Sequence, residues 1–399
     1  MARDGAIISV SDDVGLLRDV LVQGPVCALP GRLEPDDGAV HEAVRQHARF
    51  VAELKRAGVI VRHLDQLLCS ALGFADARDW IVERRVGEYE DSRRLGAEIV
   101  AWLSEKPAET LTRLLMEGMP LSALPPALNR PGVGAGAAKS WFLPPLSDMT
   151  QVRSGLRFID AGAVVCPLQP AVSRASAITF STVLNFAPLF DEARFEFWLS
   201  SDGADRSCPP IDGHDIAMPG GLVCVAAITQ ATGVLALSEL AAALFRKNKD
   251  YTVFWLDLTG TGGARLDDCF VPFDRDCLLV NSAILDMARA FAVHPNRHGM
   301  ALTVEPCRSG FLEDFARASG ARDLCLIDAR DHAGAVGTAL SHLAPILLSP
   351  RRILAFEEHE AAFGLLEQHG IEIVAVLKGS ALTQGGKGPR GLISALRAG

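Results

Sequence analysis

Residues 369–391 read His-Gly-Ile-Glu-Ile-Val-Ala-Val-Leu-Lys-Gly-Ser-Ala-Leu-Thr-Gln-Gly-Gly-Lys-Gly-Pro-Arg-Gly, and this stretch gives the first indication of the fold. Its first part is a short apolar run rich in β-branched residues, which predicts a strand. Its second part has four glycines within residues 385–391, so the backbone there can adopt positive φ and approach a ligand closely. The pattern predicts a strand that leads into an active-site turn.

The same kind of unit occurs near the other end of the chain. Residues 39–57 have apolar side chains at helical spacing, Gly58 ends the predicted helix, and residues 59–61 form a short apolar run that predicts a buried strand. Residues 365–374 repeat the order of helix, glycine and strand. This order is typical of a layered α/β fold, and its two copies indicate an internal repeat.

The middle of the chain divides into two parts with different patterns. Amphipathic helical segments at 77–85, 95–102 and 110–116 are followed by a Pro/Gly-rich linker at 125–136. From residue 141 onward, predicted strands alternate with turns and helices. They include a hairpin at 156–166, a buried strand at 221–228, a helix at 235–245 and strands at 251–258, 269–273, 324–327 and 353–356.

Composition excludes several classes of partner. The net charge of −9 argues against nucleic acid and anionic membranes, and no apolar run is long enough to span a bilayer. The first residues lack an apolar signal core, so we expect a soluble, cytoplasmic protein. The nine cysteines have scattered spacings and no C-x-x-C pair, which favours reduced, mostly buried thiols over disulfides or a zinc ribbon.

Several motifs together resemble the arginine deiminases of the guanidino-group-modifying, or pentein, superfamily. The family ends its C-terminal loop with Gly-Pro-Arg-Cys, where this chain has Gly388-Pro389-Arg390-Gly391. The turn and strand at 11–22 and the helical stretch at 75–140 also match the family in place. The resemblance implies a pentein-type α/β propeller of repeated ββαβ modules, formed by residues 1–74 and 141–399, with a helical insertion and its return linker at 75–140.

The family's reactive groups are replaced at the matching positions. Gly391 stands in the place of the nucleophilic Cys. Arg265 of Arg-Leu-Asp stands where the family has the acid/base His of His-Leu-Asp, and Arg cannot exchange a proton at working pH. Val152 takes the place of an Asp that grips the guanidinium, and Ala231 that of an Arg for the substrate carboxylate. The resemblance therefore implies loss of arginine hydrolysis.

Polar residues nevertheless persist around the expected site. Asp212-Gly213-His214-Asp215 corresponds to the family's Glu-Gly-Gly-Asp, with a shortened acid and a new imidazole. Arg265 can bind an anion or form an ion pair with Asp267, Asp212 or Asp215, and we predict the ion pair. The candidate substrate-binding residues are Asp212, His214, Asp215, Arg265, Asp267, Lys387 and Arg390. No cofactor is expected; a metal held by His214, Asp212, Asp215 and Asp267 is a lesser alternative, because their spacing matches no defined metal motif.

Two functional classes remain open. In the first, the chain is a repurposed enzyme that acts on a modified arginine or another guanidino or amino-acid-derived metabolite, in specialised natural-product biosynthesis. In the second, it is a pseudoenzyme that binds a protein partner. An open cleft lined by polar residues favours the first class, and a cleft filled by apolar side chains favours the second. The resemblance also implies a homo-oligomer.

Overall fold

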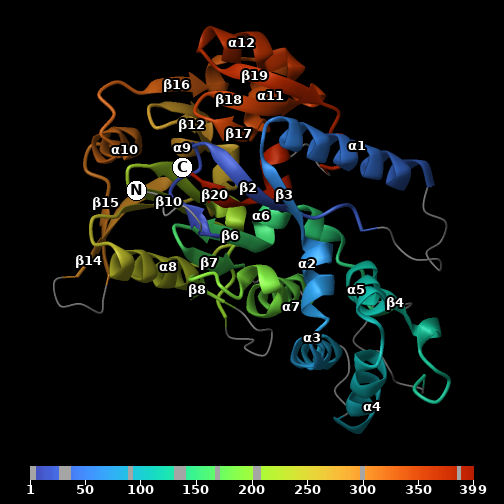
Figure 1. Ribbon diagram of the computed structural model, residues 1–399. Coiled ribbons are helices and arrows are strands. Elements are labelled where there is room, and N and C mark those ends of the chain that lie inside the picture. Colours follow the sequence, from blue (N-terminus) through green and yellow to red (C-terminus); the bar gives the residue numbers. More distant parts are fainter. Residues whose placement is uncertain are drawn as a thin grey trace.

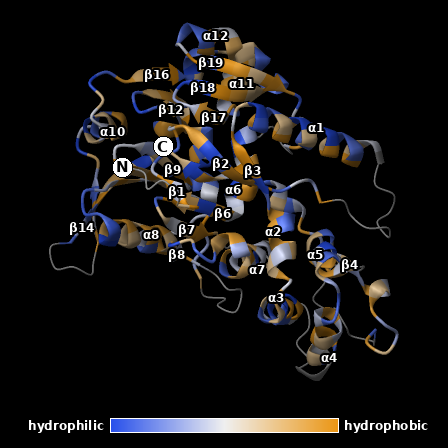
Figure 2. Cartoon of the chain, in the orientation of Figure 1, coloured by the Kyte–Doolittle hydropathy of each residue, from blue (hydrophilic) through white to orange (hydrophobic). Residues whose placement is uncertain are grey.

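The computed structural model describes residues 6–26, 37–88, 93–129, 141–166, 171–200, 208–296, 302–383 and 388–399. Figure 1 shows strands in the middle of the molecule, with α1, α8, α10 and α12 around them and α3, α4 and α5 extending to one side. Figure 2 shows hydrophobic residues gathered on the central strands and mixed hydropathy on the surrounding helices. Among the described residues, no helix is long and apolar enough to cross a membrane.

One three-stranded unit occurs five times within the described residues. In each unit the middle strand pairs antiparallel with the first strand and parallel with the third. The five units are β20 (Ile393–Ala398), β2 (Leu17–Val22) and β3 (Ile60–His63); β6 (Leu156–Ile159), β7 (Gly162–Val165) and β8 (Glu196–Leu199); β9 (Ile216–Gly220), β10 (Val223–Ile228) and β11 (Thr252–Asp257); β12 (Phe270–Asp274), β13 (Cys277–Val280) and β16 (Cys325–Asp328); and β17 (Ile346–Ser349), β18 (Arg352–Phe356) and β19 (Glu372–Leu377). The expected repeat of ββαβ modules is confirmed.

The first unit joins the two ends of the chain. Strand β20 comes from the last residues and lies between β2 and the short strand β1 (Ser9–Val10), which pairs parallel with it. The first module is thus completed by pairing strands from the two ends of the chain, with partners such as Val22 and Ile393 or Ser9 and Arg397. Such distant pairing brings Arg390, which lies just before β20, close to the N-terminal segment that contains Asp13.

Crossover helices connect the second and third strands, because parallel neighbours need a long connection. These helices are α1 (Asp37–Arg56), α7 (Ala171–Phe186), α8 (Val234–Lys247) and α12 (Phe363–Gln368). The β13–β16 connection instead contains α9 (Ser282–Leu285), α10 (Phe311–Ser319) and two strands, β14 (Arg289–Pro295) and β15 (Leu302–Pro306), which extend the β9–β10–β11 sheet to five strands. Helix α11 (Gly334–Ser341) precedes β17.

Both predicted helix–glycine–strand units are present. Gly58 and Gly370 end α1 and α12 with φ of +83° and +76°, a conformation that favours glycine. The expected burial of the first strand is wrong, because β3 lies at the edge of its sheet and Ile60 is 48% exposed. A short apolar run has the same appearance in an edge strand and a central one, whereas β10, with neighbours on both sides, is buried as predicted.

Helices fill the chain between β3 and β6. They are α2 (Leu64–Ala71), α3 (Ala75–Gly87), α4 (Arg93–Ser104) and α5 (Ala108–Glu117), followed by β4 (Met119–Pro120) and β5 (Trp141–Leu143). The three predicted helical segments are confirmed, and α2 begins the helical run earlier, at Leu64. The glycine-rich part of the predicted linker lies outside the described residues.

The described cysteines are all free thiols. Four of the eight are buried and four are partly exposed, so the expectation of mostly buried thiols holds for half of them.

Candidate functional site

Short helical turns bring the polar motifs together at the start of four modules. They are α6 (Val152–Gly155) before β6, η4 (Gly213–Asp215) before β9, η5 (Leu266–Asp268) before β12 and η8 (Pro389–Leu392) before β20. Each turn ends at or next to the first strand of its unit. The side chains of the turns therefore meet, although the motifs are far apart in sequence.

A buried group of five charged side chains and one histidine lies where these turns meet. It consists of Asp13, Arg153, Arg157, His214, Asp267 and Arg390, and we refer to these six residues as the central ion cluster. One half is built on Asp267, whose carboxylate lies 2.9 Å from His214 Nδ1, 3.1 Å from Arg390 and 3.4 Å from Arg153.

The other half of the cluster is built on Asp13, in the segment before β2. Its carboxylate lies 2.9 Å from both Arg157 and Arg390 and 3.7 Å from Arg153. Arg390 and Arg153 thus bridge the two aspartates. Buried charges are tolerated when paired in this way, and removal of one partner is strongly destabilising.

Electrostatics keep both aspartates of the cluster ionised. Burial alone would raise the pKa of Asp13, but Arg157, Arg390 and Arg153 hold it well below its usual range. Burial likewise opposes ionisation of Asp267, and Arg390, Arg153 and the hydrogen bond from His214 lower its pKa. Two carboxylates with such depressed pKa values serve as permanent negative charges rather than as proton donors.

The predicted residues Asp212, Asp215 and Arg265 have different partners. Arg265 lies 3.5 Å from Asp212, so the expected ion pair is present. The Asp212 carboxylate also accepts the His214 backbone N–H at 2.9 Å and caps η4.

Asp215 accepts hydrogen bonds from the hydroxyls of Thr229 and Thr232, at 2.7 and 2.6 Å, and from the Leu266 backbone N–H at 3.2 Å. Burial and the neighbouring Asp212 raise the pKa of Asp215 to about 7. The four side chains of the metal alternative therefore point to separate partners. Among the described residues, no three His, Cys, Asp or Glu side chains converge as metal ligands would.

Gln151 occupies the space beside Gly391. A Cβ placed on Gly391 would lie 1.9 Å from Gln151 Oε1 and 2.9 Å from His214 Cε1. The Gln151 amide N–H donates a long hydrogen bond of 3.5 Å to the Leu382 carbonyl, and its Oε1 has no partner. The sequence prediction missed Gln151, although it stands beside Val152 in a stretch that the family motifs had already marked.

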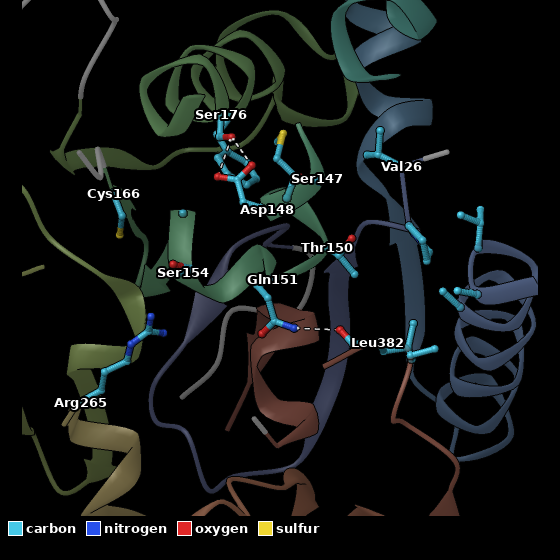
Figure 3. Close-up of a pocket in the computed structure, with 18 residues that line it drawn as sticks. Val26, Ser147, Asp148, Thr150, Gln151, Ser154, Cys166, Ser176, Arg265 and Leu382 are labelled. Atoms are coloured by element: carbon cyan, nitrogen blue, oxygen red, sulfur yellow. Dashed lines mark hydrogen bonds between the residues drawn. The ribbon is translucent and has the colours of Figure 1, made fainter. Parts of the chain in front are cut away.

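A cavity of about 650 Å³ opens on the other side of Gln151. The segment after β2, α1, α6, α7 and η2 (Ser147–Thr150) surround it, together with Ala381 and Leu382 (Figure 3). Its polar lining residues are Ser147, Asp148, Thr150, Gln151, Ser154, Cys166, Ser176 and Arg265, and its apolar ones include Pro25, Val26, Val40, Met149 and Phe180.

One carboxylate and one guanidinium line this cavity from different sides. Ser176 Oγ lies 3.1 and 3.3 Å from the two Asp148 carboxylate oxygens, while Arg265 approaches from another wall (Figure 3). Loss of solvation raises the pKa of the Asp148 carboxyl, and the Ser176 hydrogen bond and Arg85 partly offset this rise. The cavity can thus offer a cationic group a carboxylate and an anionic group a guanidinium.

The predicted site residues divide between the cavity and the cluster. Of those that the structure describes, Arg265 alone lines the cavity. His214, Asp267 and Arg390 belong to the central ion cluster, Asp212 pairs with Arg265, and Asp215 pairs with two threonines. Lys387 lies outside the described residues. No motif in the sequence marked Asp148 or Ser176 as site residues.

Comparisons with known proteins agree with this architecture. A family model described as arginine deiminase matches residues 36–397. The arginine deiminases of Rhodococcus opacus (strain B4) and Rhodococcus jostii (strain RHA1) are each 26% identical over 418 aligned residues, which cover 98% of this chain and 97% of each relative.

Solved structures show the same fold at lower identity. SxtG, an amidinotransferase of saxitoxin biosynthesis from Microseira wollei, has a TM-score of 0.55 and 12% identity, with 98% of both chains covered. The inosamine-phosphate amidinotransferase StrB1 from Streptomyces griseus has a TM-score of 0.52 and 14% identity, with 98% of this chain and 97% of that chain covered. The α/β propeller expected from the sequence is therefore confirmed.

Proposed function

The chain belongs to the arginine deiminase family, and from that membership we propose that it is a guanidino-modifying enzyme that does not hydrolyse free arginine to citrulline. Its substrate is a modified arginine or another guanidino or amino-acid-derived metabolite, in a specialised biosynthetic pathway. The alternative of a partner-binding pseudoenzyme is less favoured, because the cavity is open and its wall includes polar and charged side chains besides apolar ones.

The observation that carries the proposal is the space beside Gly391. The family resemblance assigns the nucleophilic thiol to this position, where the chain has no side chain and Gln151 Oε1 lies 1.9 Å from the place of a Cβ. Without a thiol there, the covalent intermediate of a deiminase cannot form at this residue.

Among the described residues, the one thiol that lines the cavity does not substitute for the missing nucleophile. Cys166 lines the cavity, but burial raises the pKa of its thiol, and nearby Asp212 raises it further. The nucleophile of such reactions is the thiolate, which a raised pKa disfavours. Cys166 therefore serves as part of the cavity wall in the proposed function.

The charges on the cavity wall indicate the substrate class. Asp148, whose carboxylate accepts a hydrogen bond from Ser176, is suited to a guanidinium or ammonium group, because hydrogen bonds between charged partners are the strongest available. Arg265, 3.5 Å from Asp212, is suited to a carboxylate or phosphate on the same molecule. A volume of about 650 Å³ also accommodates a ligand larger than free arginine.

A binding panel tests this proposal. Arginine, agmatine, guanidinoacetate and an N-substituted arginine are titrated against the protein by calorimetry, with norleucine as the uncharged control. We expect at least one guanidino compound to bind, and Asp148→Asn to weaken it about 10-fold or more, since a hydrogen bond to a charged group contributes roughly 1.5–3 kcal/mol. Arg265→Gln weakens only those ligands that carry an anion. Equal binding by Asp148→Asn, or binding of norleucine alone, would overturn the proposed substrate class.

A further inference from the structure

We propose that His214 is the proton-transfer residue of this chain, that Asp267 positions it, and that ligands reach its Nε2 from the cavity when the Gln151 side chain moves aside. The inference rests on the proposed function, because it supplies an acid/base group for the same site. His214 stands where the family motif has a glycine. It lies in a different module from Arg265, which occupies the place of the family's acid/base His.

The hydrogen bond to Asp267 determines which ring nitrogen of His214 carries the proton. Nδ1 lies 2.9 Å from an Asp267 carboxylate oxygen, and the depressed pKa keeps that carboxylate ionised, so it can only accept. Nδ1 must therefore donate. In the neutral ring, Nε2 is left with a lone pair that can take up a proton.

The ring is held firmly in this orientation. His214 is 5% exposed, and its backbone N–H donates to Asp212 at 2.9 Å, which fixes the turn that carries it. The other Asp267 oxygen accepts from Arg390 at 3.1 Å, so the carboxylate itself cannot turn away. A base held by a carboxylate that is itself anchored is the arrangement required of a general acid/base.

The second nitrogen of the ring is unpartnered. His214 Nε2 is buried and has no hydrogen-bond partner, and buried polar atoms in native structures rarely lack one. The neighbouring Cε1 lies 2.9 Å from the place of a Cβ on Gly391, and Gln151 Oε1 is the atom nearest to that place. Both Gln151 Oε1 and the neutral Nε2 are acceptors, so they do not stabilise each other.

Gln151 is thus a weakly held cover between the ring and the cavity. Its one hydrogen bond, to Leu382, is 3.5 Å long, and its side chain lines the cavity, which has room to receive it (Figure 3). A glycine at 391 is required for this arrangement, because a Cβ would collide with both the amide and the imidazole.

The proton balance is simple. An amine or a water, X–H, attacks the guanidino carbon of the substrate: the C–X bond forms, the X–H bond breaks and an N–H bond forms at His214 Nε2. The resulting imidazolium is stabilised by Asp267, and its proton passes to the leaving amine as the C–N bond to that amine breaks. The charged group that contacts the ring is Asp267, which also contacts Arg153 and Arg390; Asp212, paired with Arg265, contacts the backbone N–H of His214.

Accessibility of Nε2 is tested without any substrate. Diethylpyrocarbonate acylates neutral imidazole, and mass spectrometry follows the His214 and His47 peptides separately. His47 is the internal control, because it is also buried with an unpartnered Nε2 but its ring lies against Phe50 and His63 and not against Gln151. We expect Gln151→Ala to speed labelling of His214 about 10-fold and to leave His47 unchanged. If His214 keeps its wild-type rate, or both histidines accelerate alike, the cavity route is overturned.

The protonation pattern is tested on the unaltered protein. In ¹⁵N NMR spectra recorded as the pH is raised until the ring is neutral, with His214→Gln to identify the signal, we expect a protonated Nδ1 and an unprotonated Nε2. A proton on Nε2 alone would overturn the proposed base.

For any panel ligand that is turned over, His214→Gln lowers kcat about 100-fold or more with little change in KM. Asp267→Asn shifts the pH profile as well as kcat. Because the first two readouts need no ligand, failure of the binding panel leaves them able to support or refute His214.

Discussion

Replacement of Gly391 by alanine tests the description of this position most sharply. The new Cβ would lie 1.9 Å from Gln151 Oε1, which is the far end of a flexible side chain beside a cavity. Gln151 can move away at the loss of its 3.5 Å hydrogen bond to Leu382, which contributes about 1 kcal/mol or less. Alanine also lowers the conformational entropy of the unfolded chain relative to glycine. This stabilises the folded state by roughly 0.4–1 kcal/mol, since the φ of Gly391 is not positive.

The expected net cost of Gly391→Ala in the free energy of unfolding is therefore small, about 1 kcal/mol or less. In a Gln151→Ala background the cost should fall, because the 1.9 Å clash with Gln151 Oε1 is gone and only the contact with His214 Cε1 at 2.9 Å remains to be relieved. The double-mutant cycle should report this coupling directly.

Gly213→Ala is the matched control. Its Cβ would lie 1.8 Å from the backbone carbonyl of Arg153, which cannot rotate away, so we expect a loss of about 3 kcal/mol or more. Urea unfolding of the four variants and the wild-type protein measures all these differences. The reasoning is refuted if Gly391→Ala costs as much as Gly213→Ala and Gln151→Ala gives no relief.

Two further predictions concern buried carboxylates. Asp267→Ala leaves Arg153 and Arg390 without one of their two aspartates, so we expect the free energy of unfolding in urea to fall by about 3–5 kcal/mol. Glu372→Ala, in an exposed ion pair, should stay close to wild type. Similar losses for both variants would contradict the buried pairing. Asp215 has a pKa raised from 3.8 to about 7, so the folded state binds more protons than the unfolded state in this window and the free energy of unfolding falls as pH rises through it. Relative to Asp215→Asn, the wild-type protein should therefore lose up to about 4 kcal/mol between pH 4 and pH 7, and a constant difference would show that the pKa is not raised.

Local patterns in the sequence predicted much of the fold. Helical periodicity, with Gly58 and Gly370 at the helix ends, located α1, α12 and the strands that follow them. Exposure was harder to predict, because the neighbours of a strand are decided by tertiary pairing. Ile60 therefore lies on an exposed edge although its run looks like a buried strand.

The site was predicted less completely than the fold. Motif order identified Asp267, His214 and Arg390, which do meet. It did not indicate that His214 and Arg390 both contact the Asp267 carboxylate in a buried cluster. Asp13 and Gln151 were missed because their roles depend on which modules face each other across the ring. No local pattern in one sequence records that geometry.

The most direct test of the central claim is incubation of the protein with arginine labelled with ¹³C in the guanidino group, at stoichiometric concentration, followed by ¹³C NMR. The arginine deiminase of Rhodococcus opacus serves as the active reference. With no thiol at Gly391, we predict that the arginine signal persists and that no citrulline signal grows in. Conversion to citrulline at a rate comparable to the reference would contradict the account.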